Sequence, residues 1–249
     1  MVRKMISGSI ALLLLATSYL AQADTTGTVL ITGANRGIGL ELARQYADQG
    51  WTVIGTARRP AAADDLNALD VRVVQLDVTD PASVDNMADT LTGVAIDVLI
   101  NNAGILPVMR GIDDIDIATY TQILDVNTIG PVRVTQALMP NLRAGDMKKI
   151  MNTTSGLGSI SGNRSGGYFG YRESKAALNM FTLTLARELA PDGFTCIVVN
   201  PGWVRTDMGG PTAPTSVQQS ASGIRSVISK ITTADNGTFW NFEGGNEAW

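Results

Sequence analysis

From residue 28 onward, short runs of β-branched and other apolar residues alternate with longer segments of helical periodicity. Several of the short runs, such as 98–100 and 197–199, are continuously apolar, as expected for strands covered on both faces. The predicted strands are 28–32, 52–56, 71–76, 96–100, 149–153, 195–200 and 238–242, and the predicted helices are 37–49, 81–91, 116–144, 168–190 and 216–230. This alternation predicts an α/β fold, a doubly wound parallel sheet of seven strands with helices on both faces.

The first 23 residues depart from this pattern. Arg3 and Lys4 precede a short apolar run at 10–20, and Ala21-Gln22-Ala23 follows it. A basic start, a short apolar core and an Ala-x-Ala end predict a signal peptide over 1–23 and export of the chain. An uncleaved anchor or a misassigned start codon are the alternatives, and without export the protein would be cytoplasmic. The run is short for a membrane span, which needs about 20 apolar residues, so no stable span is expected after cleavage.

The remainder, 24–249, contains no linker, repeat or low-complexity stretch, so it is predicted to be a single domain. The chain has 249 residues and a net charge of −4, which argues against nucleic acid as a partner. It contains no histidine, which excludes His-based catalysis and His-ligated metals, and its single Cys196 cannot form an internal disulfide. We therefore expect no metal site.

A glycine-rich loop follows the first predicted strand and directly precedes a predicted helix. Gly33, Gly37 and Gly39 have the spacing G-x-x-x-G-x-G, and Asn35, Arg36 and Ile38 lie between or beside them. Glycines allow a tight turn and close approach of the backbone to a pyrophosphate, while the helix N-terminus supplies positive potential. The context of strand, loop and helix predicts a dinucleotide site.

The end of the second strand indicates which dinucleotide is bound. Enzymes that prefer NAD usually have an acid there that binds the ribose 2′-hydroxyl. Here Arg58 and Arg59 occupy this place, with no acid before Asp64. With Arg36, they could clamp a 2′-phosphate, because a guanidinium matches the geometry of phosphate. NADP(H) is therefore favoured over NAD(H).

Tyr171 and Lys175 are four residues apart in a predicted helix, which places a phenol and an ammonium on one helical face. A neighbouring positive charge favours the phenolate and lowers the pKa of a tyrosine. Such a pair can exchange a proton with a carbonyl or carbinol oxygen. Taken alone the spacing is weak evidence, since it also occurs on many solvated helix faces.

Taken together, these motifs resemble the short-chain dehydrogenase/reductase family along essentially the whole mature length. The matching segments are 32–39, 76–79, Asn101-Asn102-Ala103-Gly104, Asn127, Ser155, Tyr171 with Lys175, and Asn200-Pro201-Gly202. The run 202–210 and the ending Phe-Trp-Asn-Phe-Glu-Gly are similar to the C-factor-like and carbonyl-reductase-like branch. The resemblance implies a single-domain Rossmann fold.

The resemblance also implies roles for individual residues. Tyr171 would be the general acid/base at the substrate oxygen. Lys175 would hold the nicotinamide ribose and lower the pKa of Tyr171, and Asn127, inside the helix 116–144, would anchor a water that links Lys175 to solvent. The implied cofactor contacts are Asp77 and Val78 around the adenine, Asn101, Ala103 and Gly104 by the adenosine ribose, and Pro201, Gly202, Val204 and Thr206 near the nicotinamide.

The family hydroxyl usually lies about thirteen residues before the tyrosine, where this chain has Gly158. Ser155 instead comes just after the predicted strand 149–153, and a longer Gly/Ser loop follows it. Strand ends are geometrically fixed whereas loops absorb insertions, so Ser155 is preferred and Ser159 is the alternative. A hydroxyl there would hydrogen-bond the substrate carbonyl and stabilise developing negative charge.

The leading functional hypothesis is an NADP(H)-dependent oxidoreductase that interconverts a carbonyl and an alcohol in a small substrate. The alternative is an exported dinucleotide-binding signalling protein with little or no turnover, because the C-factor-like branch is associated with intercellular signalling. A sugar-nucleotide epimerase would require different glycine spacing and a larger C-terminal region. A homodimer or homotetramer is possible through the helices 116–144 and 168–190.

Overall fold

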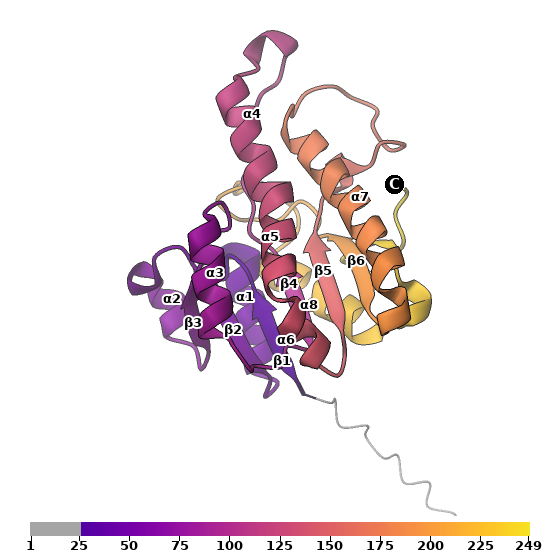
Figure 1. The fold of residues 1–249 in the computed structure, drawn as a ribbon. Coiled ribbons are helices and arrows are strands. Elements are labelled where there is room, and N and C mark those ends of the chain that lie inside the picture. Colours follow the sequence, from indigo (N-terminus) through magenta and orange to yellow (C-terminus); the bar gives the residue numbers. More distant parts are fainter. Residues whose placement is uncertain (1–25) are drawn as a thin grey trace, which may run out of the picture.

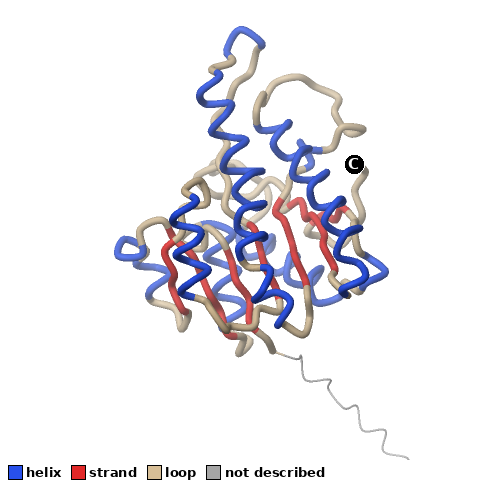
Figure 2. The backbone as a smooth tube through the Cα atoms, in the orientation of Figure 1, coloured by secondary structure: helices blue, strands red, loops and turns tan. Residues whose placement is uncertain are grey.

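The seven predicted strands form one parallel sheet in the computed structural model, which describes residues 26–249 (Figures 1 and 2). The strands are β1 (Thr28–Ile31), β2 (Thr52–Ala57), β3 (Arg72–Gln75), β4 (Val98–Asn101), β5 (Lys149–Thr153), β6 (Thr195–Asn200) and β7 (Phe239–Asn241). Their bounds differ from the predicted ones by at most two residues. The order is β3-β2-β1-β4-β5-β6-β7, so the chain reverses direction across the sheet between β1 and β4. In open α/β sheets, ligands bind at the carboxyl ends of the strands beside such a reversal.

Helices cover both faces of the sheet, as predicted for a doubly wound fold (Figure 1). One face packs against α1 (Gly37–Ala47), the short α2 (Asp64–Asn67) and α8 (Val217–Lys230). The other packs against α3 (Pro81–Thr90), α5 (Gly130–Ala137), α6 (Met139–Ala144) and α7 (Tyr171–Leu189). Alternating side chains of the strands feed the two cores: Leu99 packs on the second face and Ile100 on the first. The fold class is therefore confirmed.

Polar side chains fix where several helices begin. The Asp80 carboxylate accepts a hydrogen bond from the Ala82 N–H, and Pro81 follows at the first helical position of α3. Ser216 and Gln219 form a reciprocal capping box at the start of α8. These caps place the helices relative to the strand ends that carry the site.

The predicted helix 116–144 is not continuous. It divides into α4 (Ile117–Leu124), a π-helical turn (Asp125–Ile129), α5 and α6. Pro131 has no N–H to donate to the carbonyl of residue 127, and Pro140 has none for residue 136, so regular α-helix fails at both points. The apolar stripe that predicted one long helix runs through both interruptions. Asn127 therefore lies in the π-helical turn and not inside a regular helix.

The predicted signal peptide, 1–23, lies outside the described residues. Among residues 26–249, no helix is both long and apolar enough to cross a membrane. Figure 1 shows α4 and the loop before α7 extending beyond the carboxyl edge of the sheet.

Candidate active site

The glycine-rich loop joins β1 to the N-terminus of α1 at the carboxyl edge of the sheet. Gly33 and Gly37 have φ values of +65° and +56°, a backbone region that favours glycine. A Cβ on Gly39 would lie 2.4 Å from the Gly33 carbonyl oxygen, so the first turn of α1 packs directly on the loop. Asn35 is exposed, while Ile38 packs onto the core. The loop thus leaves backbone open at a helix N-terminus, the arrangement that accommodates a pyrophosphate.

Two residues that our sequence analysis did not select hold this loop in place. The Thr32 hydroxyl accepts hydrogen bonds from the backbone N–H groups of Asn102 and Ala103, each at 3.0 Å. The Asn102 side chain donates to the carbonyls of Thr32 and Gly33, at 3.0 and 3.3 Å. The polar run Asn101-Asn102 directly after a buried strand is the signal that could have identified Asn102. These bonds join the end of β4 to the glycine-rich loop.

Tyr171, Lys175 and Ser155 come together where β5 ends and α7 begins. Tyr171 is the first residue of α7, and Lys175 follows one turn later with its Nζ 5.7 Å from the centroid of the Tyr171 ring. The Tyr171 hydroxyl lies near the side chain of Ser155, which acts to lower the pKa of the phenol. Lys175 Nζ donates to the Thr153 carbonyl at 2.8 Å, and a Cβ on Gly104 would lie 3.8 Å from it. The three groups therefore lie beside the segment that supports the glycine-rich loop.

Burial dominates the electrostatics of the pair. It raises the pKa of Tyr171 to about 12, against the opposing effect of Ser155. It also lowers the pKa of Lys175 to about 8, because the ammonium is almost completely removed from water. We expected Lys175 to lower the pKa of Tyr171; in this structure the pKa is raised by the loss of hydration, and the opposing contribution comes from Ser155. The Tyr171 phenol accordingly holds its proton at neutral pH.

Asn127 is fully buried and its amide is saturated by protein groups. Its Oδ1 accepts from the Ile105 N–H, and its Nδ2 donates to the Ile105 carbonyl, both at 2.9 Å. Nδ2 also lies 3.1 Å from the Ser174 hydroxyl. Asn127 thus ties the loop after β4 to α7, and a Cβ on Gly104 would lie 3.3 Å from its Oδ1. It is close to Lys175, although its role through a water molecule stays a prediction.

The structure separates the two serine candidates. Ser155 follows β5, lies next to Tyr171, and its hydroxyl accepts a hydrogen bond from the Leu157 N–H at 3.2 Å. The Ser159 hydroxyl instead donates to the Ala248 carbonyl at 2.7 Å and accepts from the Gly162 N–H. Ser159 therefore fastens a loop to the C-terminal segment, and Ser155 is the serine beside the tyrosine.

On the adenine side, Asp77, Val78 and Arg58 lie at the ends of β2 and β3. Burial acts to raise the pKa of Asp77, but hydrogen bonds from Thr79 and the charge of Arg58 together lower it. Val78 is buried, and a Cβ on Gly130 would lie 2.8 Å from its side chain. Arg58 is exposed, so its guanidinium is accessible to an anionic ligand.

The side chain of Asn101 takes part in the packing of the sheet against the helices. It is buried within the sheet, and its Nδ2 donates to Thr135 and to Asn152 at 3.1 and 2.8 Å. Asn152 in turn donates to Thr182 on α7. Asn101 shares the strand face of Leu99, which is directed at α5 and α7. The side chain of Asn101 thus joins β4 and β5 to the helix layer, and a contact of this residue with the adenosine ribose stays a prediction.

The segment after β6 approaches the glycine-rich loop from another strand end. Thr206 lies beside the glycine-rich loop, where a Cβ on Gly37 would be 3.4 Å from its methyl group. The Pro201 carbonyl accepts from Ser220, Gly202 has φ +81°, and the buried Val204 pairs with Thr215. This segment therefore packs beside the glycine-rich loop.

Arg36 in the glycine-rich loop forms an ion pair with Asp207 in the segment after β6, with 3.0 Å between guanidinium nitrogen and carboxylate oxygen. Both side chains are largely exposed, at 69% and 80%. Exposed pairs contribute only about 0–1 kcal/mol, so a phosphate could readily displace Asp207 from Arg36.

The C-terminal segment, which our sequence analysis did not connect to the site, borders it. Glu247 Oε1 accepts from Asn200 Nδ2 at 2.8 Å, and a Cβ on Gly156 would lie 3.1 Å from the same nitrogen. The Trp249 carbonyl accepts from both the N–H and the hydroxyl of Ser161. The chain end therefore packs beside Ser155, a tertiary contact that no local pattern indicates.

Comparisons with known proteins agree with this geometry. The sequence profile of the short chain dehydrogenase family matches residues 27–216. The C-signal of Myxococcus xanthus is 40% identical over 154 residues, which cover 62% of this chain and 93% of that protein. The carbonyl reductase Sniffer of D. melanogaster superposes with a TM-score of 0.82 at 32% identity, covering 90% of this chain and all of that one. The NADPH-bound carbonyl reductase from chicken fatty liver gives a TM-score of 0.84 at 34% identity, with 90% and 99% covered. Because the matched region spans most of the chain and these relatives are more than 30% identical, the protein belongs to the short-chain dehydrogenase family, near its C-factor-like and carbonyl-reductase-like members.

Proposed function

We propose that this protein is an NADP(H)-dependent oxidoreductase that reduces a small carbonyl compound to an alcohol, with Tyr171 as the proton donor. The observation that supports this most is the convergence of the Tyr171 phenol, the Ser155 hydroxyl and the Lys175 ammonium beside the glycine-rich loop. A phenol that is protonated at neutral pH suits reduction, since the new alcohol oxygen must receive a proton.

The dinucleotide fits the residues that are present. The backbone of the loop 33–39 is open at a helix N-terminus, and the exposed Arg58 stands where a 2′-phosphate would be held. The NADPH-bound chicken carbonyl reductase, similar over nine tenths of the chain, supports the same cofactor. When bound, the nicotinamide would supply the hydride for the carbonyl carbon.

The protein's own groups would provide the rest of the chemistry. Ser155 would donate a hydrogen bond to the substrate oxygen and so stabilise the charge that develops there. Tyr171 would transfer its proton to that oxygen, leaving a phenolate that solvent re-protonates. Lys175, 5.7 Å from the ring, would stabilise this transient phenolate by its charge.

The test is Tyr171→Phe, which removes the proton and leaves the ring. We expect a loss of about 10²–10⁴-fold in NADPH-dependent turnover of an aldehyde, ketone or quinone panel, the range for general acid catalysis. The dissociation constant for NADPH, measured by fluorescence titration, should change little. Equal turnover in both proteins would remove Tyr171 from the mechanism.

Cofactor preference is tested separately with Arg58→Asp. A carboxylate repels the 2′-phosphate but can bond a 2′-hydroxyl, so NADPH affinity should fall by about tenfold or more while NADH affinity is maintained. An unchanged ratio of the two affinities would refute the phosphate clamp at Arg58. Arg187→Asp, at an exposed position on α7, makes the same charge change away from the proposed phosphate clamp and is the control.

The similarity to the C-signal protein favours a second candidate, an exported dinucleotide-binding signalling protein. In that case the purified protein would bind NADPH but turn over no member of the substrate panel. Fractionation of the producing cells would then find it outside the cytoplasm.

A further inference from the structure

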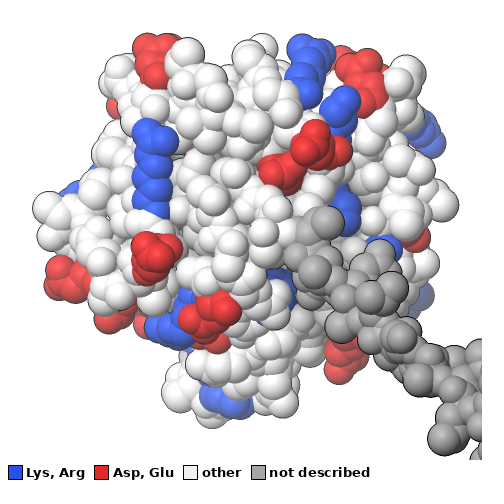
Figure 3. Space-filling model, turned by 90° about the horizontal axis from the view of Figure 1, so that it is seen from below, with Lys and Arg blue, Asp and Glu red and all other residues white. Residues whose placement is uncertain are grey.

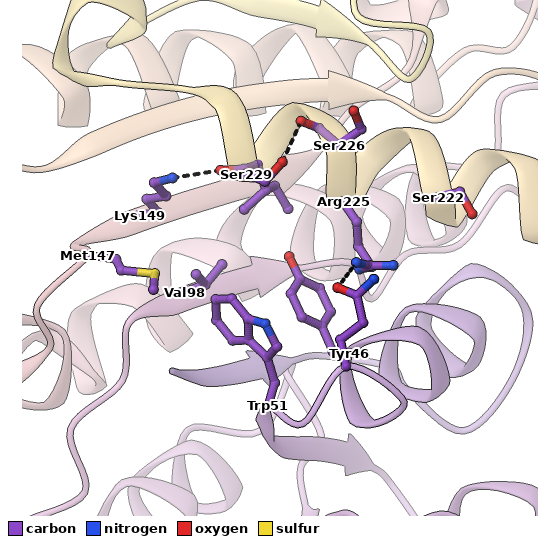
Figure 4. A pocket seen from close by; sticks show the side chains of 11 residues that line it. Tyr46, Trp51, Val98, Met147, Lys149, Ser222, Arg225, Ser226 and Ser229 are labelled. Carbon is purple, nitrogen blue, oxygen red and sulfur yellow. Dashed lines mark hydrogen bonds between the residues drawn. The ribbon is translucent and has the colours of Figure 1, made fainter. Parts of the chain in front are cut away.

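A cavity of about 320 Å³ lies at the amino ends of the strands, on the opposite edge of the sheet from Tyr171. Lys149 and Val98 line it from the first positions of β5 and β4, and Tyr46 lines it from the last turn of α1 (Figure 4). The helix α8 forms its roof through Arg225 and three serines. None of the residues assigned to the dinucleotide or to the chemistry contributes to it.

The lining of this cavity is cationic. Lys149 and Arg225 belong to it, and no Asp or Glu does. Within residues 26–249, neither cation takes part in an ion pair. The visible exterior of the lower face carries basic and acidic side chains interspersed (Figure 3), so the excess of positive charge is a property of the cavity. Asp97, next to Val98, is occupied elsewhere, because its two oxygens accept from three backbone N–H groups.

Arg225 is held in a fixed position at one end. Its guanidinium lies 5.3 Å above the Tyr46 ring, and it donates to the side-chain oxygens of Gln45 and Gln49. Its Nε–H is buried and has no hydrogen-bond partner within residues 26–249. Because Arg225 gives only one N–H of each terminal nitrogen to Gln45 and Gln49, the other N–H of each can donate to an anionic oxygen.

Lys149 occupies the other end of the cavity in Figure 4. Its ammonium donates to the Ile228 carbonyl at 2.7 Å, which uses one of its three protons. Burial lowers the pKa of Lys149, so the charge is held at a free-energy cost that a bound anion would offset.

The wall between the two cations is aromatic and apolar. Trp51 and Met147 are partly exposed there, and the buried Tyr46 and Val98 pack behind them, with Tyr46 edge to face on Trp51 at 4.9 Å (Figure 4). Such a surface favours the flat body of an organic molecule over a hydrated inorganic ion.

We propose that this cavity binds a small organic anion with a flat, largely apolar body, of the aromatic carboxylate or phosphate monoester class, at a site separate from the active site. The anionic oxygens would contact Arg225, Lys149 or both, and the serine hydroxyls of α8 would complete the shell.

The test uses benzoate and phenyl phosphate as probes, in isothermal titration of the folded protein saturated with NADP⁺. Either probe should bind with a dissociation constant of about 1 mM or tighter. Inorganic phosphate, which lacks the body, and benzyl alcohol, which lacks the charge, should bind more weakly. The ¹⁵N-indole signal of Trp51, assigned with Trp51→Phe, should shift on binding.

Arg225→Gln and Lys149→Gln should each weaken the better probe at least about tenfold, since each removes a charged hydrogen bond. Arg187→Gln, an exposed arginine on α7, makes the same charge change outside the cavity and should have no effect. Arg58→Gln should also leave probe binding unchanged, which distinguishes the cavity from the proposed dinucleotide site. Three results would each overturn the proposal. They are no saturable binding of either probe up to about 20 mM, an affinity in both cavity variants equal to that of the wild type, or benzyl alcohol binding as tightly as benzoate.

Discussion

Lys175 carries its charge in a position where only 4% of the residue is exposed. Its hydrogen bond to the Thr153 carbonyl replaces only part of the lost hydration, and this accounts for its lowered pKa. A buried, incompletely compensated charge destabilises the folded state, a common property of groups kept for function rather than for stability.

This gives a prediction for Lys175→Met. The pKa of Lys175 is about 8 when folded and about 10.4 when unfolded, so the unfolded state binds the extra proton between these values. The contribution of Lys175 to the free energy of unfolding therefore rises as the pH increases between these two pKa values. The wild type should gain up to about 3 kcal/mol of unfolding free energy relative to Lys175→Met between about pH 7.5 and 10, in urea titrations.

Comparing the two proteins at each pH cancels the titration of groups they share. Lys230→Met, at the exposed end of α8, is the control and should run parallel to the wild type. If the difference in unfolding free energy between the wild type and Lys175→Met did not change with pH, the Lys175 ammonium would not destabilise the folded state.

At this scale the sequence was informative about which residues meet and less so about their orientation and energy. The four-residue spacing placed Tyr171 and Lys175 on one face, and the position at a strand end selected Ser155 over Ser159. The direction of the pKa shift at Tyr171 depends on burial by distant segments, which spacing does not contain. The spacing also did not indicate that the Asn101 side chain packs against the helices, because its strand face decides its orientation.

Among the elements, the π-helical turn between α4 and α5 has the clearest connection to the site. It directs the Asn127 amide at both backbone groups of Ile105 and at Ser174 on α7. Turns of this kind within helices are frequent at functional sites. The proline at 131 explains why the helix cannot continue regularly, but an amphipathic stripe alone does not report such a break.

We predict that Asn127→Leu, which keeps a similar volume, lowers the free energy of unfolding by about 2–5 kcal/mol. The N–H and carbonyl of Ile105 would lose their partners, and each unsatisfied buried group costs about 1–3 kcal/mol. Chemical denaturation measures the loss. Asn67→Ala serves as the control, since its hydrogen bond to the Pro60 carbonyl is exposed; a loss of similar size there would undermine the assignment.

In the whole molecule, the strand order brings residues from opposite ends of the sequence to one edge. The loop after β1, the segment after β4, the end of β5 and the segment after β6 meet there. Strand–helix alternation predicted this architecture almost completely, because each βαβ unit has only one favourable handedness. The packing of the chain end beside Ser155 was not predictable, since contacts between residues nearly 90 apart leave no local pattern.

Deletion of residues 247–249 tests the importance of that contact. It removes the bonds from Ser159 and Ser161 and the contact between Asn200 and Glu247. At about 1 kcal/mol for each hydrogen bond, we expect a loss of about 2–5 kcal/mol in unfolding free energy. Turnover should fall more than NADPH affinity, because Ser155 is adjacent and the glycine-rich loop is not. Glu243→Gln, on the exposed turn just before, should leave both quantities unchanged.

The seating of Trp249 has a practical consequence for anyone producing this protein. A hexahistidine tag or fluorescent fusion appended after the last residue would extend the backbone from a carbonyl that already accepts two hydrogen bonds. The first residues of the fusion would contact the Ser155–Ser161 loop, and we expect them to lower turnover while the protein stays folded. Turnover measured on C-terminally fused material would then be too low, so a tag on the segment 24–249 belongs before β1, which begins at the opposite edge of the sheet.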